Sequence, residues 1–159
     1  MFERFRKDSR AIVLDAMKEA RVRADARIEA EHLLLALARR SAWDAGRVLA
    51  EAGIDHDGLR AAFDDEVRHT LEAVGVGSGA TWIPDSTLPV AGQPRWGESA
   101  KMALRRATIA AKDRGDRQLT PTHILIGVLR AREGTVPRAL VAAGVNPAEL
   151  AAHAEATLS

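Results

Sequence analysis

The sequence predicts an all-α protein in which two pseudo-symmetric four-helix repeats pack as one eight-helix bundle. Three observations predict this fold. One segment recurs at a constant spacing, helix caps and stops recur at equivalent positions, and alanine and leucine dominate the apolar residues. Only 4% of the 159 residues are aromatic, whereas 47% are hydrophobic. This composition favours helices that pack closely through small side chains.

The repeat is the strongest of these observations. The segment E-H-L-L-L-A-L-A-R at 31–39 returns as T-H-I-L-I-G-V-L-R at 122–130, and the spacing of 91 residues holds without a gap from the first predicted helix to the last. It also matches an aromatic with an aromatic and a cation with a cation: Phe5 with Trp96 and Arg10 with Lys101. A fixed spacing indicates one supersecondary unit used twice. We therefore expect a single domain with repeat one at 1–72, a linker at 73–97 and repeat two at 98–159.

Four helices are predicted in the first repeat. The first covers 8–24, with Asp8 or Ser9 as its cap, and the second covers 30–40 and should be buried, because it is apolar nearly all round. The third covers 44–52 and is stopped by Gly53. Asp55 then caps a fourth helix, whose apolar positions recur at i, i+4 and i+8: Leu59, Phe63 and Val67.

The second repeat follows the same order. A helix over 98–114 ends at Gly115, and the next begins at Thr120-Pro121, where threonine caps and proline occupies the first turn. A short helix over 136–143 ends at Gly144, and Asn146-Pro147 opens the last helix. Asp55 and Asn146 are equivalent in the repeat and both are good caps, so the two positions match in their expected capping role as well as in sequence.

Between the repeats the composition changes to that of a linker, rich in Gly, Pro, Ser and Thr. The tryptophans Trp82 and Trp96 lie in it, and we expect the chain to fold back onto the helices near Trp96. No strand is predicted anywhere, since Thr81-Trp82-Ile83 is too short to form one by itself. The glycine-rich run at 75–79 follows no strand and precedes no helix, so it indicates linker and not a phosphate-binding loop.

Charge and composition exclude several functional classes. The net charge is +1, which gives no whole-molecule field to attract nucleic acid. No apolar run approaches the length of a membrane span, and the N-terminus has no apolar core of signal-peptide length. The absence of cysteine fits a reducing compartment, so we expect a soluble cytoplasmic protein without membrane partners.

Catalytic motifs are missing from the sequence. There is no P-loop, no G-x-S-x-G elbow and no H-E-x-x-H, and five scattered histidines without cysteine are weak evidence for a metal. No cofactor or metal is therefore expected. His32 and His123, at equivalent places in the first turn of a buried helix, are the exception to weigh. They form either a shared metal or acid–base site or, as we favour, two structural histidines that satisfy polar groups near the helix start.

The start of the chain, M-F-E-R-F at 1–5, and E-H-L-L-L-A-L at 31–37 together resemble the N-terminal domain of the Clp/Hsp100 unfoldases, most closely the ClpC type. The resemblance extends from Met1 to about Leu158 and covers both repeats. It implies an all-helical bundle of two four-helix repeats. In full-length unfoldases this domain precedes the ATPase rings. No ATPase module follows in this sequence, so we expect a free-standing Clp-repeat protein.

The resemblance implies a phosphoarginine pocket in the first repeat. The family positions match Arg4 and Glu31, while a family threonine is replaced by Arg6, which changes the charge of the pocket. In the second repeat Thr122 stands where the family has glutamate. Because a guanidinium needs a carboxylate for a bidentate hydrogen bond, the second pocket is expected to be lost.

The resemblance also implies a groove for cyclic peptides where the first helices of the two repeats meet. Its family positions match six residues: Phe2, Arg10, Val13, Leu14, Trp96 and Lys101. Arg105 replaces an acidic residue of the family, so one contact changes sign. The alternative is that Phe2, Phe5 and Val13 seal the interface between the repeats and that Arg10 and Lys101 are only solvated.

These observations predict a non-catalytic module that binds peptides or proteins. The resemblance implies Clp substrates, adaptors or Clp-targeting cyclic-peptide antibiotics as ligands, and a free domain would then act as a decoy that sequesters the antibiotics. The alternative is a regulatory or adaptor-like partner of a ClpC-type ATPase–protease, including recognition of phosphoarginine proteins. An enzyme is disfavoured, because no activated nucleophile or metal constellation is visible.

Overall fold

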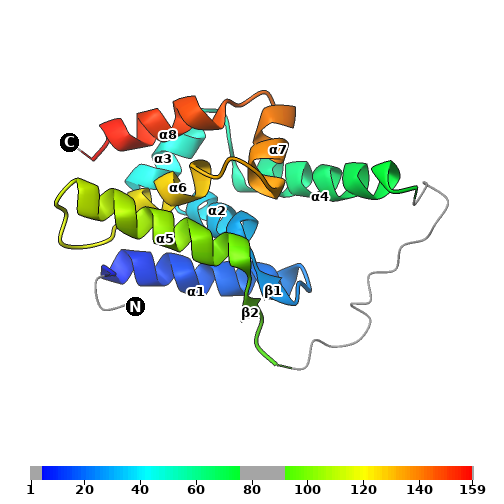
Figure 1. Ribbon diagram of the computed structural model, residues 1–159, viewed down its shortest axis with the longest axis horizontal. Coiled ribbons are helices and arrows are strands. Elements are labelled where there is room, and N and C mark those ends of the chain that lie inside the picture. The colour runs from blue at the N-terminus through cyan, green and yellow to red at the C-terminus, as the bar shows by residue number, and fades with distance from the viewer. Residues whose placement is uncertain (1–4, 76–91, 159) are drawn as a thin grey trace.

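The computed structural model describes residues 5–75 and 92–158, and it confirms the all-α fold (Figure 1). Within these residues the first repeat forms α1 (Lys7–Val22), α2 (Ala30–Arg39), α3 (Asp44–Glu51) and α4 (His56–Ala73). The second forms α5 (Glu98–Asp113), α6 (Pro121–Leu129), α7 (Thr135–Ala142) and α8 (Pro147–Ala156). The bounds of α5 and α7 are those of α1 and α3 moved by 91 residues, so the repeat of the sequence is a repeat of the structure.

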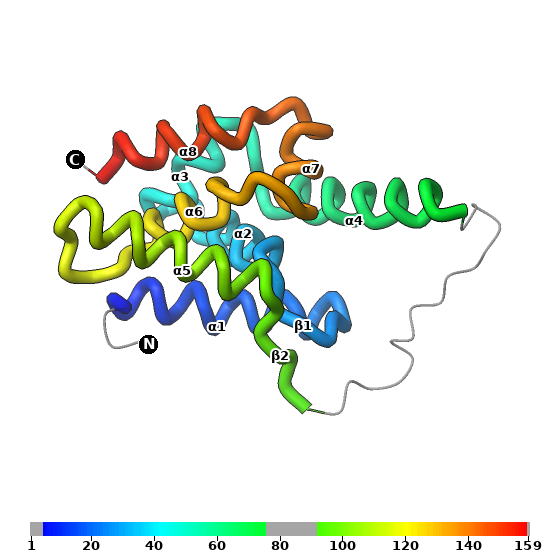
Figure 2. The backbone as a smooth tube through the Cα atoms, viewed as in Figure 1, coloured from blue at the N-terminus to red at the C-terminus, as the bar shows by residue number. Residues whose placement is uncertain are grey.

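The two most apolar helices form the centre of the bundle. α2 and α6 pack against each other and lie between α1 and α5 on one side and α3, α7 and α8 on the other (Figure 2). Residues 32–38 of α2 and 122–129 of α6 are buried, as predicted from their nearly continuous apolar sequence. α1 and α5 run in opposite directions in the same outer layer, each with its alanine-rich side toward α2 and α6.

The fourth helices of the two repeats differ in length. α4 has 18 residues and α8 has 10, so α4 continues about two turns beyond the point where its equivalent ends and projects from the bundle (Figure 1). The apolar spacing of α4 continues past the buried Phe63 to Val67, which is 41% exposed. Where α4 crosses the bundle, Arg23 forms an ion pair with Asp64 at 3.0 Å and Arg138 of α7 forms one with Glu66.

Most of the predicted caps are present, and one prediction is wrong. The side chains of Asp55 and Asn146 accept backbone N–H bonds at the starts of α4 and α8, and Thr120 caps α6 with Pro121 in its first turn. By contrast, neither Asp8 nor Ser9 caps α1. The N-cap is Arg6, without a side-chain bond, and the Ser9 hydroxyl instead donates to the Leu119 carbonyl at 2.5 Å.

The predicted stops are also present. The three glycines after α3, α5 and α7 all have positive φ, the left-handed conformation that ends helices: Gly53, Gly115 and Gly144.

The prediction that the chain has no strands is wrong at the junction between the repeats. β1 (Arg27–Ile28) pairs in parallel with β2 (Arg95–Trp96), and Ile28 lies in register with Trp96. The repeat-equivalent contact is a parallel bridge from Phe5 to Leu119. Each pairing joins one repeat to the other, and two residues are too few to show an alternating pattern in sequence. Trp96 is half-buried against the core, so the predicted return of the chain near Trp96 is confirmed.

Candidate functional site

His32 has a structural role at the start of α2. Its Nδ1 accepts the backbone N–H of Glu29 at 2.8 Å, and the Glu29 side chain accepts a backbone N–H of the first turn, which completes a capping box. Its Nε2 lies 2.8 Å from the Asp25 carboxylate. An acceptor Nδ1 and a donor Nε2 are the two roles of a neutral imidazole, so both ring nitrogens are satisfied within the first repeat.

His123 repeats this arrangement in α6. Its Nδ1 accepts the N–H of Thr120 at 3.0 Å, and its Nε2 donates to Asp116 at 3.0 Å. Burial lowers the pKa of His123, although hydrogen bonding to Asp116 opposes the shift. The favoured interpretation of the two histidines, as structural caps, is therefore confirmed. Residues 5–75 and 92–158 hold no cluster of three or more His, Cys, Asp or Glu side chains that could bind a metal ion.

One carboxylate links the two repeats. Glu29 caps α2 and also accepts hydrogen bonds from Ser99 at the start of α5, from its backbone N–H at 3.2 Å and from its hydroxyl at 2.5 Å. The Ser99 hydroxyl in turn accepts the N–H of Ala30 at 2.8 Å. Gly97 lies so close that a Cβ there would be 2.0 Å from Glu29 Oε1, so any larger residue would displace the Glu29 carboxylate from this junction.

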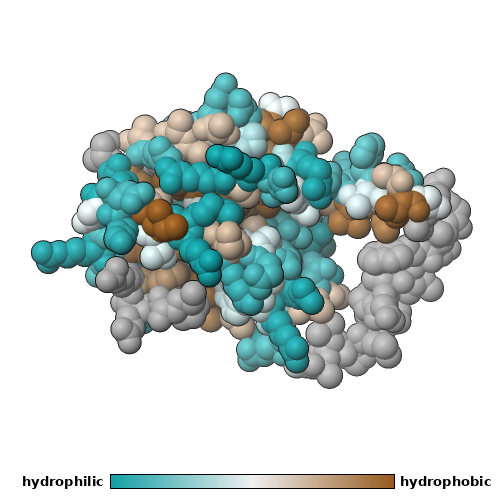
Figure 3. Space-filling view, viewed as in Figure 1, coloured by the Kyte–Doolittle hydropathy of each residue, from teal (hydrophilic) through white to brown (hydrophobic). Residues whose placement is uncertain are grey.

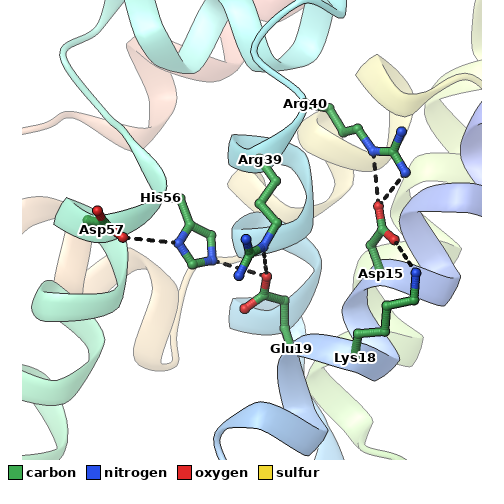
Figure 4. A network of polar contacts seen from close by, with 7 residues as sticks. All are labelled: Asp15, Lys18, Glu19, Arg39, Arg40, His56 and Asp57. Atoms are coloured by element: carbon green, nitrogen blue, oxygen red, sulfur yellow. Dashed lines mark hydrogen bonds and ion pairs between the residues drawn. The ribbon is translucent and has the colours of Figure 1, made fainter.

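A second polar network holds α1 to the ends of α2 and α4 (Figure 4). Glu19 is only 4% exposed, and its carboxylate accepts from Arg39 and lies 3.0 Å from His56 Nε2. Burial pushes the pKa of Glu19 up, but the hydrogen bonds from Arg39 and His56 outweigh it, and the net pKa is lowered. Beside it, Asp15 accepts two hydrogen bonds from Arg40, at 2.7 and 3.0 Å. These carboxylates serve the packing of repeat one.

Glu31, a residue of the predicted phosphoarginine pocket, lies in the first turn of α2. Burial raises its pKa, with the neighbouring carboxylates Glu29 and Asp25 acting in the same direction and His32 opposing them. A backbone hydrogen bond to its carboxylate also opposes the shift. The second pocket residue, Arg4, lies outside the described residues. Thr122, the equivalent of Glu31, is buried at the start of α6.

The predicted groove residues of repeat one lie on different sides of α1. Arg10 is exposed and Leu14 is 57% exposed on the outer side of the helix. Val13 is 8% exposed and belongs to the core. Phe2 lies outside the described residues. The alternative interpretation, in which Phe5 and Val13 seal the interior, agrees with the burial of both side chains.

In repeat two the predicted residues also separate. Trp96 lies at the β1–β2 junction, half-buried, while Lys101 is exposed on the outer side of α5 and pairs with Glu98 at 2.9 Å. Arg105 is exposed one turn further along α5.

The outer sides of α1 and α5 together form what we call the α1–α5 face. It consists of four exposed positions on each helix: Arg10, Leu14, Lys18 and Arg21 on α1, and Lys101, Arg105, Ile109 and Lys112 on α5. Figure 3 shows the front surface of α5 as largely hydrophilic, with separate hydrophobic side chains between the polar ones. The sequence predicts Arg10, Leu14, Lys101 and Arg105 as candidate binding residues, but Lys18, Arg21, Ile109 and Lys112 were not predicted. Their helical spacing at repeat-equivalent positions was the signal that could have found them.

None of the described helices is both long enough and apolar enough to cross a membrane.

Comparison of the sequence with known proteins identifies its relatives. The chain is 28% identical over 147 residues to the rice (Oryza sativa subsp. japonica) chloroplastic chaperone protein ClpC1. The aligned region covers 92% of this chain and 14% of that protein. It is 27% identical over 150 residues to the chloroplastic chaperone protein ClpC1 of Arabidopsis thaliana, covering 94% of this chain and 14% of the relative. The chain thus spans about one seventh of the length of these relatives.

Solved structures share the fold. The N-terminal domain of the ClpD chaperone from Arabidopsis thaliana aligns over 100% of both chains with a TM-score of 0.69 and 22% identity. The Hsp104 N-terminal domain from Candida albicans aligns over 96% of this chain and 89% of its own, with a TM-score of 0.64 and 19% identity. The family model described as the Clp repeat (R) N-terminal domain matches residues 4–85 and 95–159. The chain therefore belongs to the Clp repeat N-terminal domain family.

Proposed function

We propose that this chain is a non-catalytic module that binds peptide or protein segments on its α1–α5 face. The observation that carries the proposal is the exposure of aliphatic side chains between cations on two equivalent helices. Leu14 is 57% exposed and Ile109 is 48% exposed, although both lie on helices whose opposite sides form the core. An exposed aliphatic side chain between cations offers a contact for the apolar part of a peptide whose polar groups pair with those cations.

The roles of the polar groups elsewhere support binding over catalysis. His32 and His123 are each committed to a capping box, and Glu19 is held by Arg39 and His56. No nucleophile beside a base is formed by these groups. Membership of the Clp repeat family supports a role in recognition of Clp substrates or adaptors.

Binding can be measured by isothermal titration calorimetry, with a cyclomarin-type cyclic peptide and with a permanently unfolded protein as a model substrate. We expect heat with at least one of them, and expect Leu14→Ala to weaken the binding. Val141→Ala is the matched control, because Val141 is an exposed aliphatic residue on α7, away from the α1–α5 face. No heat with either ligand at tens of micromolar protein would overturn the proposal.

The finer form of the proposal is a decoy that sequesters Clp-targeting cyclic peptides. Addition of the purified protein to a ClpC-type unfoldase inhibited by such a peptide should then restore unfolding activity in proportion to the amount added. If the unfoldase stays inhibited while the protein co-purifies with it or with its adaptors, the decoy form is wrong and a regulatory partner of the ATPase–protease replaces it.

A further inference from the structure

The outer side of α1 carries three cations and one aliphatic residue. Arg10, Leu14, Lys18 and Arg21 follow one another at intervals of four, four and three residues, which places them along one side of the helix. All four are exposed. A solvated helix side usually mixes acids and bases, so a line of four positions without an acid is a departure that calls for a reason.

α5 carries the same combination at the equivalent positions. Lys101, Arg105, Ile109 and Lys112 have the same spacing and are likewise exposed. The cations at the two ends are retained between the repeats. The two middle positions differ: Arg105 is equivalent to Leu14, and Ile109 is equivalent to Lys18. The single aliphatic residue of α5 therefore lies one turn later in the helix than that of α1. At these four positions both helices thus present three cations and one aliphatic side chain, and on α5 the acidic Glu98 lies on the same side, three residues before Lys101.

The carboxylates beside Lys18 and Lys101 neutralise these two cations only in part. Lys18 pairs with Asp15 at 3.3 Å, but Asp15 is also held by Arg40 at 2.7 Å. Lys101 pairs with Glu98 at 2.9 Å, and both side chains are more than half exposed. Exposed pairs of this kind contribute little and are readily replaced by a better partner.

The positive charge belongs to this face and not to the molecule as a whole. The net charge of the chain is +1, and α4 is acidic, with five carboxylates at 57, 64, 65, 66 and 72 against arginines at 60 and 68. The charge of the α1–α5 face is therefore balanced by acidic surface elsewhere. A local positive field of this kind selects and orients anionic partners.

We infer that the α1–α5 face selects acidic peptide segments that also carry an aliphatic side chain. This inference rests on the proposed binding function and names the chemistry of its ligand. Carboxylates of such a segment would pair with the cations of both helices, and its aliphatic side chains would contact Leu14 and Ile109. The aliphatic residues favour a protein segment over nucleic acid, whose phosphates would use the cations alone.

Two fluorescein-labelled peptides test the inference by fluorescence anisotropy. They share length and leucine positions, but one carries glutamate and the other lysine at every charged position. We expect the acidic peptide to bind and the basic peptide not to, and expect the affinity to fall between about 50 and about 300 mM NaCl, because salt screens exposed charges.

Variants locate the binding. Arg105→Glu combined with Lys112→Glu should weaken binding of the acidic peptide about 2- to 30-fold or more, from the loss of favourable pairs and the gain of repulsion. The matched control is Arg60→Glu combined with Arg132→Glu. It makes the same change in net charge at exposed arginines away from the α1–α5 face and should leave binding unchanged.

Each other outcome overturns the inference in a distinguishable way. If both peptides bind equally, or if the control variant loses as much affinity as the α5 variant, the α1–α5 face does not select acidic peptides. The proposed binding function would still stand. An oligonucleotide that displaces the acidic peptide at equal charge would assign the cations to nucleic acid. If neither peptide binds while the cyclic peptide does, only the acidic ligand is excluded; if nothing binds, the proposed function fails as well.

Discussion

Gly127 offers a direct test of how closely the helices of repeat two are packed. It lies in α6, and its carbonyl accepts a hydrogen bond from Arg106 of α5 at 2.7 Å. A Cβ at this position would lie 2.2 Å from the carbonyl oxygen of Ala103, 2.8 Å from the backbone nitrogen of Ala107 and 3.0 Å from its Cβ. Two of these neighbours are backbone atoms of a long helix and cannot move aside as a side chain can.

The magnitude follows from this geometry. Ordinary van der Waals contact begins near 3.4 Å, so Gly127→Ala requires α5 and α6 to separate by about 1 Å. Overpacking of this kind costs about 1–3 kcal/mol, with the upper end expected where backbone atoms collide. Alanine is favoured over glycine in a helix by about 1 kcal/mol, which offsets part of the cost. A net loss of about 1–2 kcal/mol corresponds to a fall in Tm of roughly 2–8 °C for a chain of this size.

Thermal unfolding followed by circular dichroism measures the effect. Gly58→Ala is the control, since its Cβ would meet only the Asp55 side chain, at 2.8 Å from Oδ1. Any weakening of the Asp55 cap is offset by the higher helix propensity of alanine, so we expect a change of less than about 1 kcal/mol. If Gly127→Ala melts at or above the temperature of the unaltered protein, the close approach of α5 and α6 is refuted. If both variants lose the same stability, helix packing is not the cause.

Three further predictions concern ionisable and hydrogen-bonding groups. Glu31→Gln should raise the Tm at pH 7 and not at pH 4. Burial raises the pKa of Glu31, so the stability that the neutral carboxyl contributes is full below pH 4.5 and is lost as the pH rises through the raised pKa. Equal effects of the substitution on Tm at both pH values would contradict this. The ring of His123 should titrate below its ordinary pKa of 6.5 in an NMR titration, because burial disfavours the charged ring. The stability contributed by the neutral ring is therefore present above pH 6.5 and lost as the pH falls through the lowered pKa. A midpoint at or above 6.5 would disprove the buried neutral ring. Ser99→Ala should cost about 1–3 kcal/mol in urea unfolding, since it removes the hydroxyl bonds to Glu29 and from the Ala30 N–H. The loss should be smaller in a Glu29→Ala background, where only the bond from Ala30 remains to be removed, and an undiminished loss would show that the two residues do not act together.

The sequence predicts the helices well where the signal is local. Asp55, Asn146 and Thr120 cap helices because a short polar side chain before an apolar run satisfies the first N–H groups, whatever surrounds it. The prediction for α1 fails for the opposite reason. Ser9 has the chemistry of a cap, but its hydroxyl is used by Leu119, which is 110 residues away in sequence.

The candidate site is predictable only in part, for the same physical reason. Val13 and Leu14 are adjacent and both aliphatic, yet one is buried and the other exposed, because successive residues of a helix face different directions. The sequence alone does not decide which side of α1 meets α2. Once the repeat-equivalent helix α5 is placed beside α1, the cations at 18, 21 and 112 join the residues already named.

The pairing of strands between the repeats has a consequence for how the chain folds. Ile28 meets Trp96 and Phe5 meets Leu119, so the segment that leads into each first helix is completed only by the other half of the chain. The segment before each first helix therefore stays unpaired until the other half of the chain docks, and contacts over such long separations slow folding relative to a helical bundle with local contacts only. The two halves should therefore unfold in one transition. Supplied as separate polypeptides, 1–75 and 92–159 should each be largely unstructured and should regain helicity together on mixing, in a second-order reaction.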